Sequence, residues 1–144
     1  MTWRDLEQAK PELAAAGARR LHGRVAYLAT VSPDGAPRVH PVTPIVGEGH
    51  LFVFMEPTSP KGTDLRRGSR YALHSPVRDP SGSEGEFLVN GTGAAIGDPA
   101  VRAGAERNAT YSPDPRYVLF VLSVKSAVLT EYVEGRPVRR RFSR

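Results

Sequence analysis

The residues best suited to chemistry in this sequence form a candidate anion site. Thr58, Ser59 and Lys61 follow an apolar stretch and precede a short helical one. Hydroxyl groups, free backbone N–H groups and a lysine at the start of a helix favour binding of a phosphate. Arg38, on a preceding predicted strand, adds a second cation if the strand ends meet. The simpler alternative is a helix cap at Thr58 or Ser59 beside an exposed lysine.

Other kinds of active site have little support. The four histidines show no short paired spacing, and the chain has no cysteine and no HExxH motif, so we expect no metal site. There is also no GxSxG elbow, and scattered residues do not define a Ser/His/Asp triad. The absence of cysteine excludes disulfides and cysteine nucleophiles. We therefore assign no catalytic residue.

The net charge of +5 belongs to the C-terminal end of the chain. Five of the 20 basic residues lie in residues 136–144 without an acid, which leaves residues 1–135 with 15 residues of each sign. Because duplex-binding domains usually spread basic residues along a face, we expect no nucleic-acid partner. Val138, Arg140 and Phe142 alternate as in a strand. This tail is therefore either a groove wall or dimer contact, or an ordinary solvated end.

Length and composition indicate one globular domain. The chain has 144 residues, of which 40% are hydrophobic and 24% charged. Acids and a proline occupy the region where a signal peptide is apolar, and no apolar run is long enough to span a bilayer. We expect a cytoplasmic protein without a membrane partner. Its single domain, 1–144, would comprise N-terminal helices at 2–22, a barrel at 25–133 and a basic strand at 136–144.

Helical spacing is limited to short segments. Leucines recur at helical intervals within residues 2–22, but Pro11 interrupts the pattern and predicts a second helix that begins there. Two further short helices are predicted at 62–67 and 98–108, the latter with Asp98 as its cap.

The rest of the chain has the composition of strands separated by turns. Seven stretches qualify: 25–31, 37–46, 50–56, 70–76, 86–96, 117–124 and 127–133. Pro41 and Pro44 lack the N–H that a central strand needs, so the second stretch must be interrupted or lie at an edge, where a ligand can use its backbone. We predict a mainly β fold, a barrel of six to seven mostly antiparallel strands with short flanking helices.

Two segments resemble a known family. YLATVSPDGAPRVHPVTPIV and HLFVFMEPTSPKGTDLRRGSRYALH are similar to the FMN-binding split-barrel family that includes pyridoxamine 5'-phosphate oxidase and its flavin and deazaflavin relatives. The resemblance covers residues 25–93 and combines an ATxxxDGxPR turn, an RxxPV strand and SxKxxxLRR. It implies a split β-barrel and a homodimer with the flavin in a groove at the subunit interface.

The resemblance also assigns residues to the cofactor. Arg38 matches the phosphate-binding arginine of the family, and Ser59 and Lys61 match its phosphate loop. The strand that runs along the flavin corresponds to residues 39–43, and the end of the next strand corresponds to 54–55. The complete predicted cofactor-binding set is Arg38, Val39, His40, Pro41, Val42, Thr43, Phe54, Met55, Thr58, Ser59 and Lys61.

The sequence departs from the true oxidases at several points. Pro60 stands where an arginine is common, and Glu86 stands where the family presents a glutamine from the partner subunit. The C-terminal Arg-x-His and the Tyr/Arg/Ser set that hold pyridoxal phosphate have no counterpart. We therefore do not expect oxidation of pyridoxamine phosphate.

The anion site and the resemblance together predict an FMN-dependent oxidoreductase. It would transfer a hydride or electrons between the flavin and an unidentified small molecule. Two alternatives keep the same fold. One is a reductase that uses the deazaflavin coenzyme F420, and the other is a non-enzymatic protein that binds flavin or heme.

Overall fold

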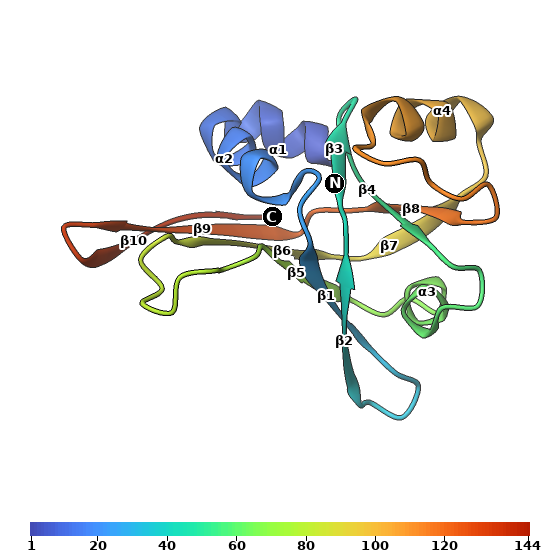
Figure 1. Ribbon diagram of the computed structural model, residues 1–144, viewed down its shortest axis with the longest axis horizontal. Helices are drawn as coiled ribbons and strands as arrows, with labels where there is room; N and C mark the ends of the chain where they lie inside the picture. Colours follow the sequence, from blue (N-terminus) through green and yellow to red (C-terminus); the bar gives the residue numbers. More distant parts are fainter.

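Two antiparallel β-sheets make up most of the chain, and four short helices pack against them (Figure 1). The computed structural model describes residues 1–144. In spatial order, the six-stranded sheet consists of β10 (Arg136–Ser143), β9 (Ser126–Val133), β6 (Glu86–Gly91), β5 (Tyr71–His74), β1 (Ala26–Val31) and β2 (Pro37–Val42). The four-stranded sheet consists of β3 (Ile45–Gly47), β4 (His50–Met55), β8 (Val118–Leu122) and β7 (Gly93–Ile96). This architecture confirms the predicted mainly β, antiparallel split barrel.

The structure has ten strands instead of the six or seven predicted for the barrel. The chain changes sheets inside two of the seven predicted stretches, and the basic tail adds the tenth strand. The stretch 37–46 divides after β2, and Thr43 and Pro44 carry the chain to β3 in the other sheet. The stretch 86–96 divides at Thr92, between β6 and β7. Pro41 lies in β2, which is an edge strand, as its missing N–H requires.

The four helices are α1 (Trp3–Ala9), α2 (Pro11–Leu21), α3 (Pro60–Arg66) and α4 (Pro99–Asn108). Pro11 begins α2, and the side chain of Asp98 caps α4 by accepting from the N–H of Ala100, both as predicted. The third helix begins at Pro60, two residues earlier than expected, because proline suits the first turn of a helix. None of these helices combines the length and the apolar character that a membrane span requires.

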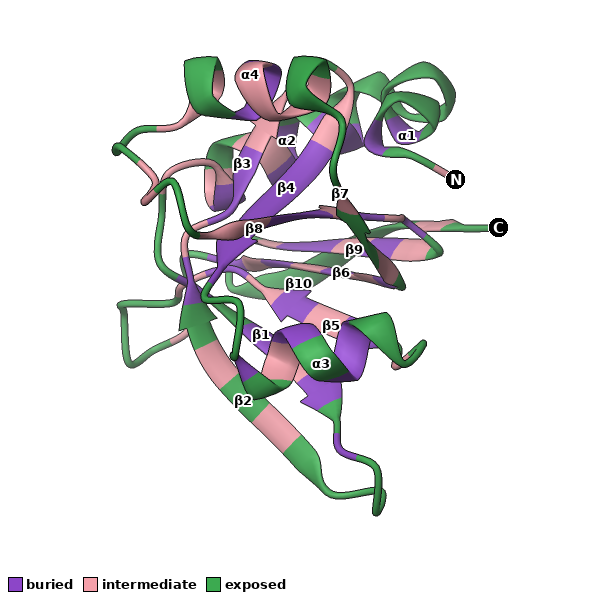
Figure 2. Cartoon of the chain, turned by 90° about the vertical axis from the view of Figure 1, so that its right-hand side faces the viewer, coloured by how far each residue is buried: buried purple, intermediate pink, exposed green.

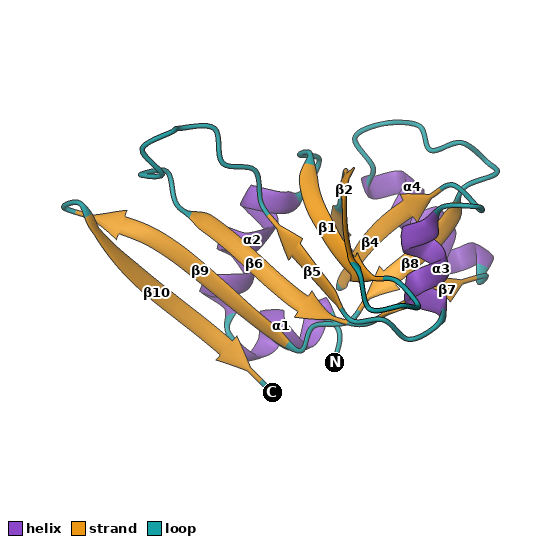
Figure 3. Cartoon of the chain, turned by 90° about the horizontal axis from the view of Figure 1, so that it is seen from below, coloured by secondary structure: helices purple, strands orange, loops and turns teal.

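The helices leave one face of the six-stranded sheet open. α2 packs on β6 and β9 from one side, and α3 contacts β1 and β7. Figure 3 looks onto the opposite face, where no helix lies over β10, β9, β6 and β5. Side chains on this outer face are accessible: Tyr27 is 49% exposed, Val31 43% and Val39 63%. We refer to it below as the outer face of the six-stranded sheet.

The basic tail forms the edge strand β10, which pairs with β9 along its whole length. The hairpin that the two strands form extends to one end of the molecule (Figure 1). β10 is exposed at nearly every residue. Nη1 of Arg140 lies 3.9 Å from Oε2 of Glu12, and Nη2 of Arg140 lies 3.8 Å from Oε1 of Glu131. All three side chains are accessible to solvent. Such exposed pairs contribute little to stability, about 1 kcal/mol or less.

The main core lies between the two sheets and the N-terminal helices. Trp3 and Phe87 are both fully buried and meet edge to face, with ring centroids 6.1 Å apart. A glycine allows α2 to approach this pair, because a Cβ added at Gly17 would lie 2.5 Å from Cζ of Phe87. In the other sheet, β4 is buried from its second residue to its last (Figure 2).

We expect Gly17→Ala to destabilise the protein by about 1–3 kcal/mol, because the fully buried Phe87 ring has no room to move away from the new methyl group. Urea unfolding measures the effect. Gly62→Ala is the matched control, a helical position where the nearest atoms of Phe120 would lie at 3.4 Å. Equal midpoints for both variants would contradict the assigned packing.

Candidate functional site

A buried carboxylate connects the elements that carry the predicted site. Asp64, on α3, has a side chain only 1% exposed. Its Oδ2 accepts hydrogen bonds from Oγ1 of Thr30 at 2.8 Å and from Nε of Arg38 at 2.9 Å. Its Oδ1 accepts from Nη1 of Arg67 at 3.2 Å. Three donors, from β1, β2 and the end of α3, thus compensate the loss of water around this charge.

The surroundings of Asp64 keep it ionised. Burial alone would raise the pKa of its carboxyl, but the hydrogen bonds from Thr30 and Arg67 and the charge of Arg38 outweigh burial and lower the pKa below its usual value. Since the carboxylate holds Arg38 through Nε, the two Nη groups of that side chain form no hydrogen bond within the chain. They are free to bind an anion.

The predicted phosphate loop has a second cation. Nζ of Lys61 donates to Oγ of Ser59 at 3.1 Å, and Ser59 is only 7% exposed. Ser59 stands at the cap position of α3 but its hydroxyl does not cap the helix. Lys61 forms no ion pair, and partial burial lowers the pKa of its ammonium group, which a bound anion would counteract. Thr58 is exposed and makes no side-chain hydrogen bond.

The edge strand β2 offers its backbone to a ligand. It pairs with β1 on one side and with no strand on the other. Arg38 and His40 are half-buried on one face, whereas Val39 and Pro41 are exposed on the other. Val42 is buried and Thr43 half-buried in the connection to β3.

Phe54 and Met55 have side chains in the core. The ring of Phe54 belongs to the smaller cluster beneath α4, and the guanidinium of Arg102 lies 5.0 Å from its centroid. Met55 is 1% exposed and belongs to the main core. Any contact of these two residues with a ligand would therefore use their backbone atoms.

The structure brings Arg38 to the helix that follows Ser59 and carries Lys61, and sequence reasoning missed Asp64, the residue that holds Arg38 there. Arg38 reaches α3 through Asp64, three residues after Lys61. The sequence feature that could have indicated its role is that Asp64 is the single acid in the segment SPKGTDLRR, among three basic residues. Thr30 and Arg67, its other partners, carried no such signal.

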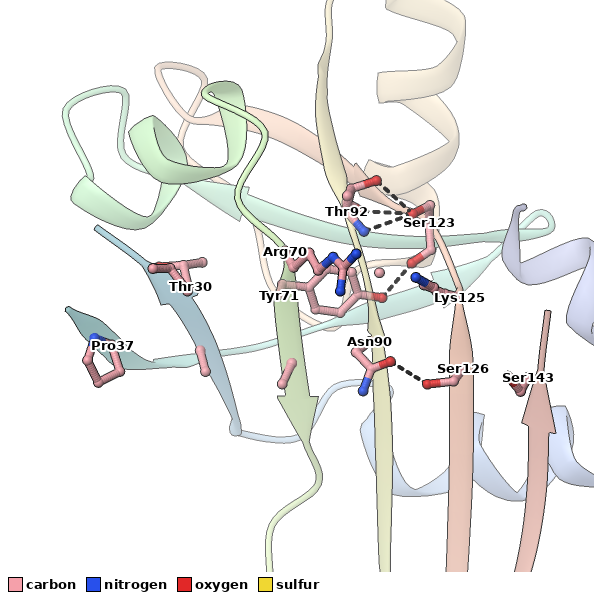
Figure 4. Close-up of a pocket in the computed structure, with 14 residues that line it drawn as sticks. Thr30, Pro37, Arg70, Tyr71, Asn90, Thr92, Ser123, Lys125, Ser126 and Ser143 are labelled. Carbon is pink, nitrogen blue, oxygen red and sulfur yellow. Dashed lines mark hydrogen bonds between the residues drawn. The ribbon is translucent and has the colours of Figure 1, made fainter. Parts of the chain in front are cut away.

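A groove of about 550 Å³ opens next to this site, on the outer face of the six-stranded sheet (Figure 4). Arg70 and Lys125 line it, together with several hydroxyl side chains and no carboxylate. At its base, the Tyr71 hydroxyl donates to the backbone carbonyl of Ser123 at 2.7 Å. Burial raises the pKa of the Tyr71 hydroxyl, which therefore stays protonated.

Glu86 is paired within its own chain. Its Oε2 lies 2.7 Å from Nε2 of His74, and Nδ1 of His74 lies 2.7 Å from the carbonyl of Ser75. Both side chains belong to the outer face of the sheet, where Tyr27 pairs in register with His74. The acid that departs from the family pattern is thus held by a histidine.

We expect Asp64→Asn to destabilise the protein by about 1–3 kcal/mol at pH 7, because Arg38 and Arg67 lose a shared charged acceptor. The pKa of Asp64 is lowered on folding, so its contribution to stability is present above about pH 3.9 and is lost as the pH falls further, through the folded-state pKa. Urea unfolding from pH 3 to 7 should show the difference between the two proteins shrinking at the acid end. Glu7→Gln, at an exposed residue without an ion pair, should have no such effect.

Comparisons with known proteins give the family. The family described as pyridoxamine 5'-phosphate oxidase matches residues 15–130. Three solved structures superpose with similar quality. A heme binding protein from Mycobacterium smegmatis is 19% identical, with a TM-score of 0.67 over 90% of this chain and 57% of that one. PhzG from Burkholderia lata 383, in complex with tetrahydrophenazine-1-carboxylic acid, is 17% identical, with a TM-score of 0.66 over 97% and 86% of the two chains.

A NimC/NimA family protein from Clostridium acetobutylicum is 17% identical, with a TM-score of 0.66 over 88% of this chain and 94% of that one. No curated protein sequence matches. At these identities the solved structures establish the fold alone, and the chain spans 57% of the length of the Mycobacterium protein. Since the family match covers most of the residues, the chain belongs to the pyridoxamine 5'-phosphate oxidase family.

Proposed function

We propose that this protein is an FMN-dependent oxidoreductase in which Arg38, Ser59 and Lys61 bind the FMN phosphate. The observation that carries the proposal is the contact of Arg38 with Asp64 at 2.9 Å, because it places Arg38 beside the helix that also carries Lys61. One cation on β2 and one cation on α3 are thereby carried by two elements that are in contact. Neither forms an ion pair with any carboxylate other than Asp64, so both can make charge-assisted hydrogen bonds to a phosphate.

The residues around these cations suit the remainder of an FMN molecule. The unpaired edge of β2 presents backbone N–H and C=O groups, which are obligatory hydrogen-bonding groups and match the polar edge of a flavin ring. Val39, which is 63% exposed, offers an apolar contact beside them. The related PhzG structure holds tetrahydrophenazine-1-carboxylic acid, a fused-ring compound, which supports the idea that this fold accepts flat ring systems.

The residues present suggest which roles belong to the protein and which to the cofactor. Bound FMN would supply the hydride chemistry. Arg38, Ser59 and Lys61 would bind and orient it, and the backbone of β2 would fix the ring. His40 is the only titratable side chain of β2 besides Arg38, which makes it the candidate to hold a proton near the ring. Oxidation of pyridoxamine phosphate is not part of this proposal.

We further propose that the protein acts as a homodimer, with the second copy on the outer face of the six-stranded sheet. Tyr27, Val31 and Val39 expose apolar surface there beside β2, and an uncovered apolar face of this kind is typical of an interface. A second copy on this face would enclose a ligand that lies along β2. A cytoplasmic location stays a prediction.

Two alternatives share this fold. Coenzyme F420 also carries a ribityl phosphate, so the cations at Arg38 and Lys61 suit it as well. A non-enzymatic flavin- or heme-binding protein is supported by the likeness to the heme binding protein from Mycobacterium smegmatis. Absorption spectra and titrations of the purified protein with FMN, F420 and heme distinguish these cofactors. Reduction of the bound flavin by a nicotinamide donor distinguishes the enzyme from a binding protein.

Arg38→Ala and Lys61→Ala should each weaken FMN binding by about 1.5–3 kcal/mol, because each change removes a charge-assisted contact to the phosphate. Fluorescence titration of the apoprotein measures the dissociation constant. Arg24→Ala and Lys10→Ala are the controls, since both residues are exposed and form no ion pair. Unchanged FMN affinity in the folded Arg38 and Lys61 variants would refute the assigned phosphate site.

Tyr27→Glu should convert a dimer into a monomer, because it introduces a charge into the centre of the proposed interface. Sedimentation equilibrium should give twice the chain mass of 15.7 kDa for the wild type and 15.7 kDa for the variant. Tyr111→Glu is the matched control, a tyrosine that is 38% exposed and lies outside both sheets. A monomeric wild type, or equal dissociation of both variants, would reject this interface.

A further inference from the structure

Helix α3 carries more charge toward the predicted phosphate than the assigned residues account for. Lys61 and Asp64 lie three positions apart, and Arg67 follows at the end of the helix after three more. Residues at this spacing share one face of a helix. Arg38 meets the same face from β2, through its contact with Asp64. Two arginines thus contact a single buried carboxylate, and Lys61 lies about one turn before it on the same helix.

Arg67 is fixed in place in the same way as Arg38. Its Nη1 donates to Oδ1 of Asp64 at 3.2 Å, and its Nη2 donates to the backbone carbonyl of Val31 at 3.1 Å. Each of these nitrogens has a second N–H, and the side chain of Arg67 is 39% exposed. The side chain of Arg38 is 35% exposed. Both guanidinium groups are therefore oriented by protein contacts and still accessible to a ligand.

The charges of the cluster formed by Lys61, Arg38, Arg67 and Asp64 do not cancel. Three cations and one carboxylate leave two positive charges. Asp34 and Arg66 change this count little. Asp34, in the β1–β2 turn, is exposed and held by Ser32 and the N–H of Ala36, so water screens it. Arg66 points elsewhere, with its guanidinium 5.8 Å from the centroid of the Phe120 ring.

A net charge of +2 matches the charge of a phosphomonoester better than that of a phosphodiester. A terminal phosphomonoester carries about 1.5–2 negative charges at pH 7. A phosphodiester, whose phosphorus has only one ionisable oxygen, carries one. A cluster that is pre-oriented and partly buried distinguishes the two more strongly than free side chains in water would, because the interaction is less screened.

We propose that Arg67 is a third cation of the phosphate site and that the cluster of Lys61, Arg38, Arg67 and Asp64 selects a phosphomonoester over a phosphodiester. Asp64 is the positioning residue that holds both arginines. The inference rests on the proposed function and narrows it, since FMN ends in a phosphomonoester whereas the phosphate of coenzyme F420 is a diester.

The test compares three flavins that differ only at the phosphate: FMN, its phosphate methyl ester and riboflavin. We expect the wild-type apoprotein to bind FMN at least about tenfold more tightly than the methyl ester. Arg67→Gln should weaken FMN binding about 10- to 100-fold, weaken methyl ester binding less, and leave riboflavin binding unchanged. A loss of structure alone would affect all three flavins equally.

Arg66→Gln is the matched control, because it removes the same charge from the neighbouring residue, whose guanidinium lies over Phe120. Arg67→Lys keeps the charge without the forked geometry and should retain part of the preference for FMN. This second variant keeps the test decisive if the glutamine variant does not fold.

Two results would overturn the inference while leaving the proposed function intact: equal wild-type affinity for FMN and its methyl ester, or the same flavin affinities in Arg67→Gln and Arg66→Gln. If the wild type binds none of the three flavins, the proposed function itself is refuted. Phenyl phosphate and its methyl ester then decide separately whether the cluster selects a phosphomonoester.

Discussion

The hydrogen bonds to the Asp64 carboxylate are the interaction on which the rest of the site depends. An ionised carboxylate that is 1% exposed would cost several kcal/mol without partners. Its donors come from β1, β2 and the end of α3, so the charge is compensated only when these elements meet. The same contacts orient Arg38 and Arg67. Folding and the orientation of both arginines therefore share one constraint, and a change to it affects both.

The division of the barrel into two sheets explains why these elements meet. The chain leaves the six-stranded sheet after β2 at Thr43 and Pro44, passes through β3 and β4, and returns through α3 to β5, the neighbour of β1. The second half of α3, with Asp64 and Arg67, is thereby placed beside the β1–β2 hairpin, at Thr30, Val31 and Arg38. A single continuous strand over 37–46 would have prevented this crossing, and proline at position 44 favours the break.

Sequence reasoning recovered the parts of the structure that local chemistry determines. Pro41 indicated an edge strand, which the structure confirms. The anion site indicated by the residue types of Arg38, Ser59 and Lys61 stays a prediction. Sequence reasoning did not recover Asp64, because an acid becomes a bridging group only through contacts between segments far apart in sequence. It did not establish whether Phe54 and Met55 face a ligand with their side chains or their backbone, since a strand covered on both faces has no alternation to reveal it.

The distribution of carboxylates around the site has a chemical consequence. A free acid beside a flavin would disfavour negative charge on the reduced ring. Glu86, the acid that departs from the family pattern, is in contact with Nε2 of His74 at 2.7 Å, and the other nitrogen of that ring faces the carbonyl of Ser75. Both ring nitrogens of His74 thus face oxygen atoms, Oε2 of Glu86 and the carbonyl oxygen of Ser75. Asp64 in turn is shared between two arginines. Each acid therefore has partners within the chain, so neither position presents an unpaired carboxylate to a ligand.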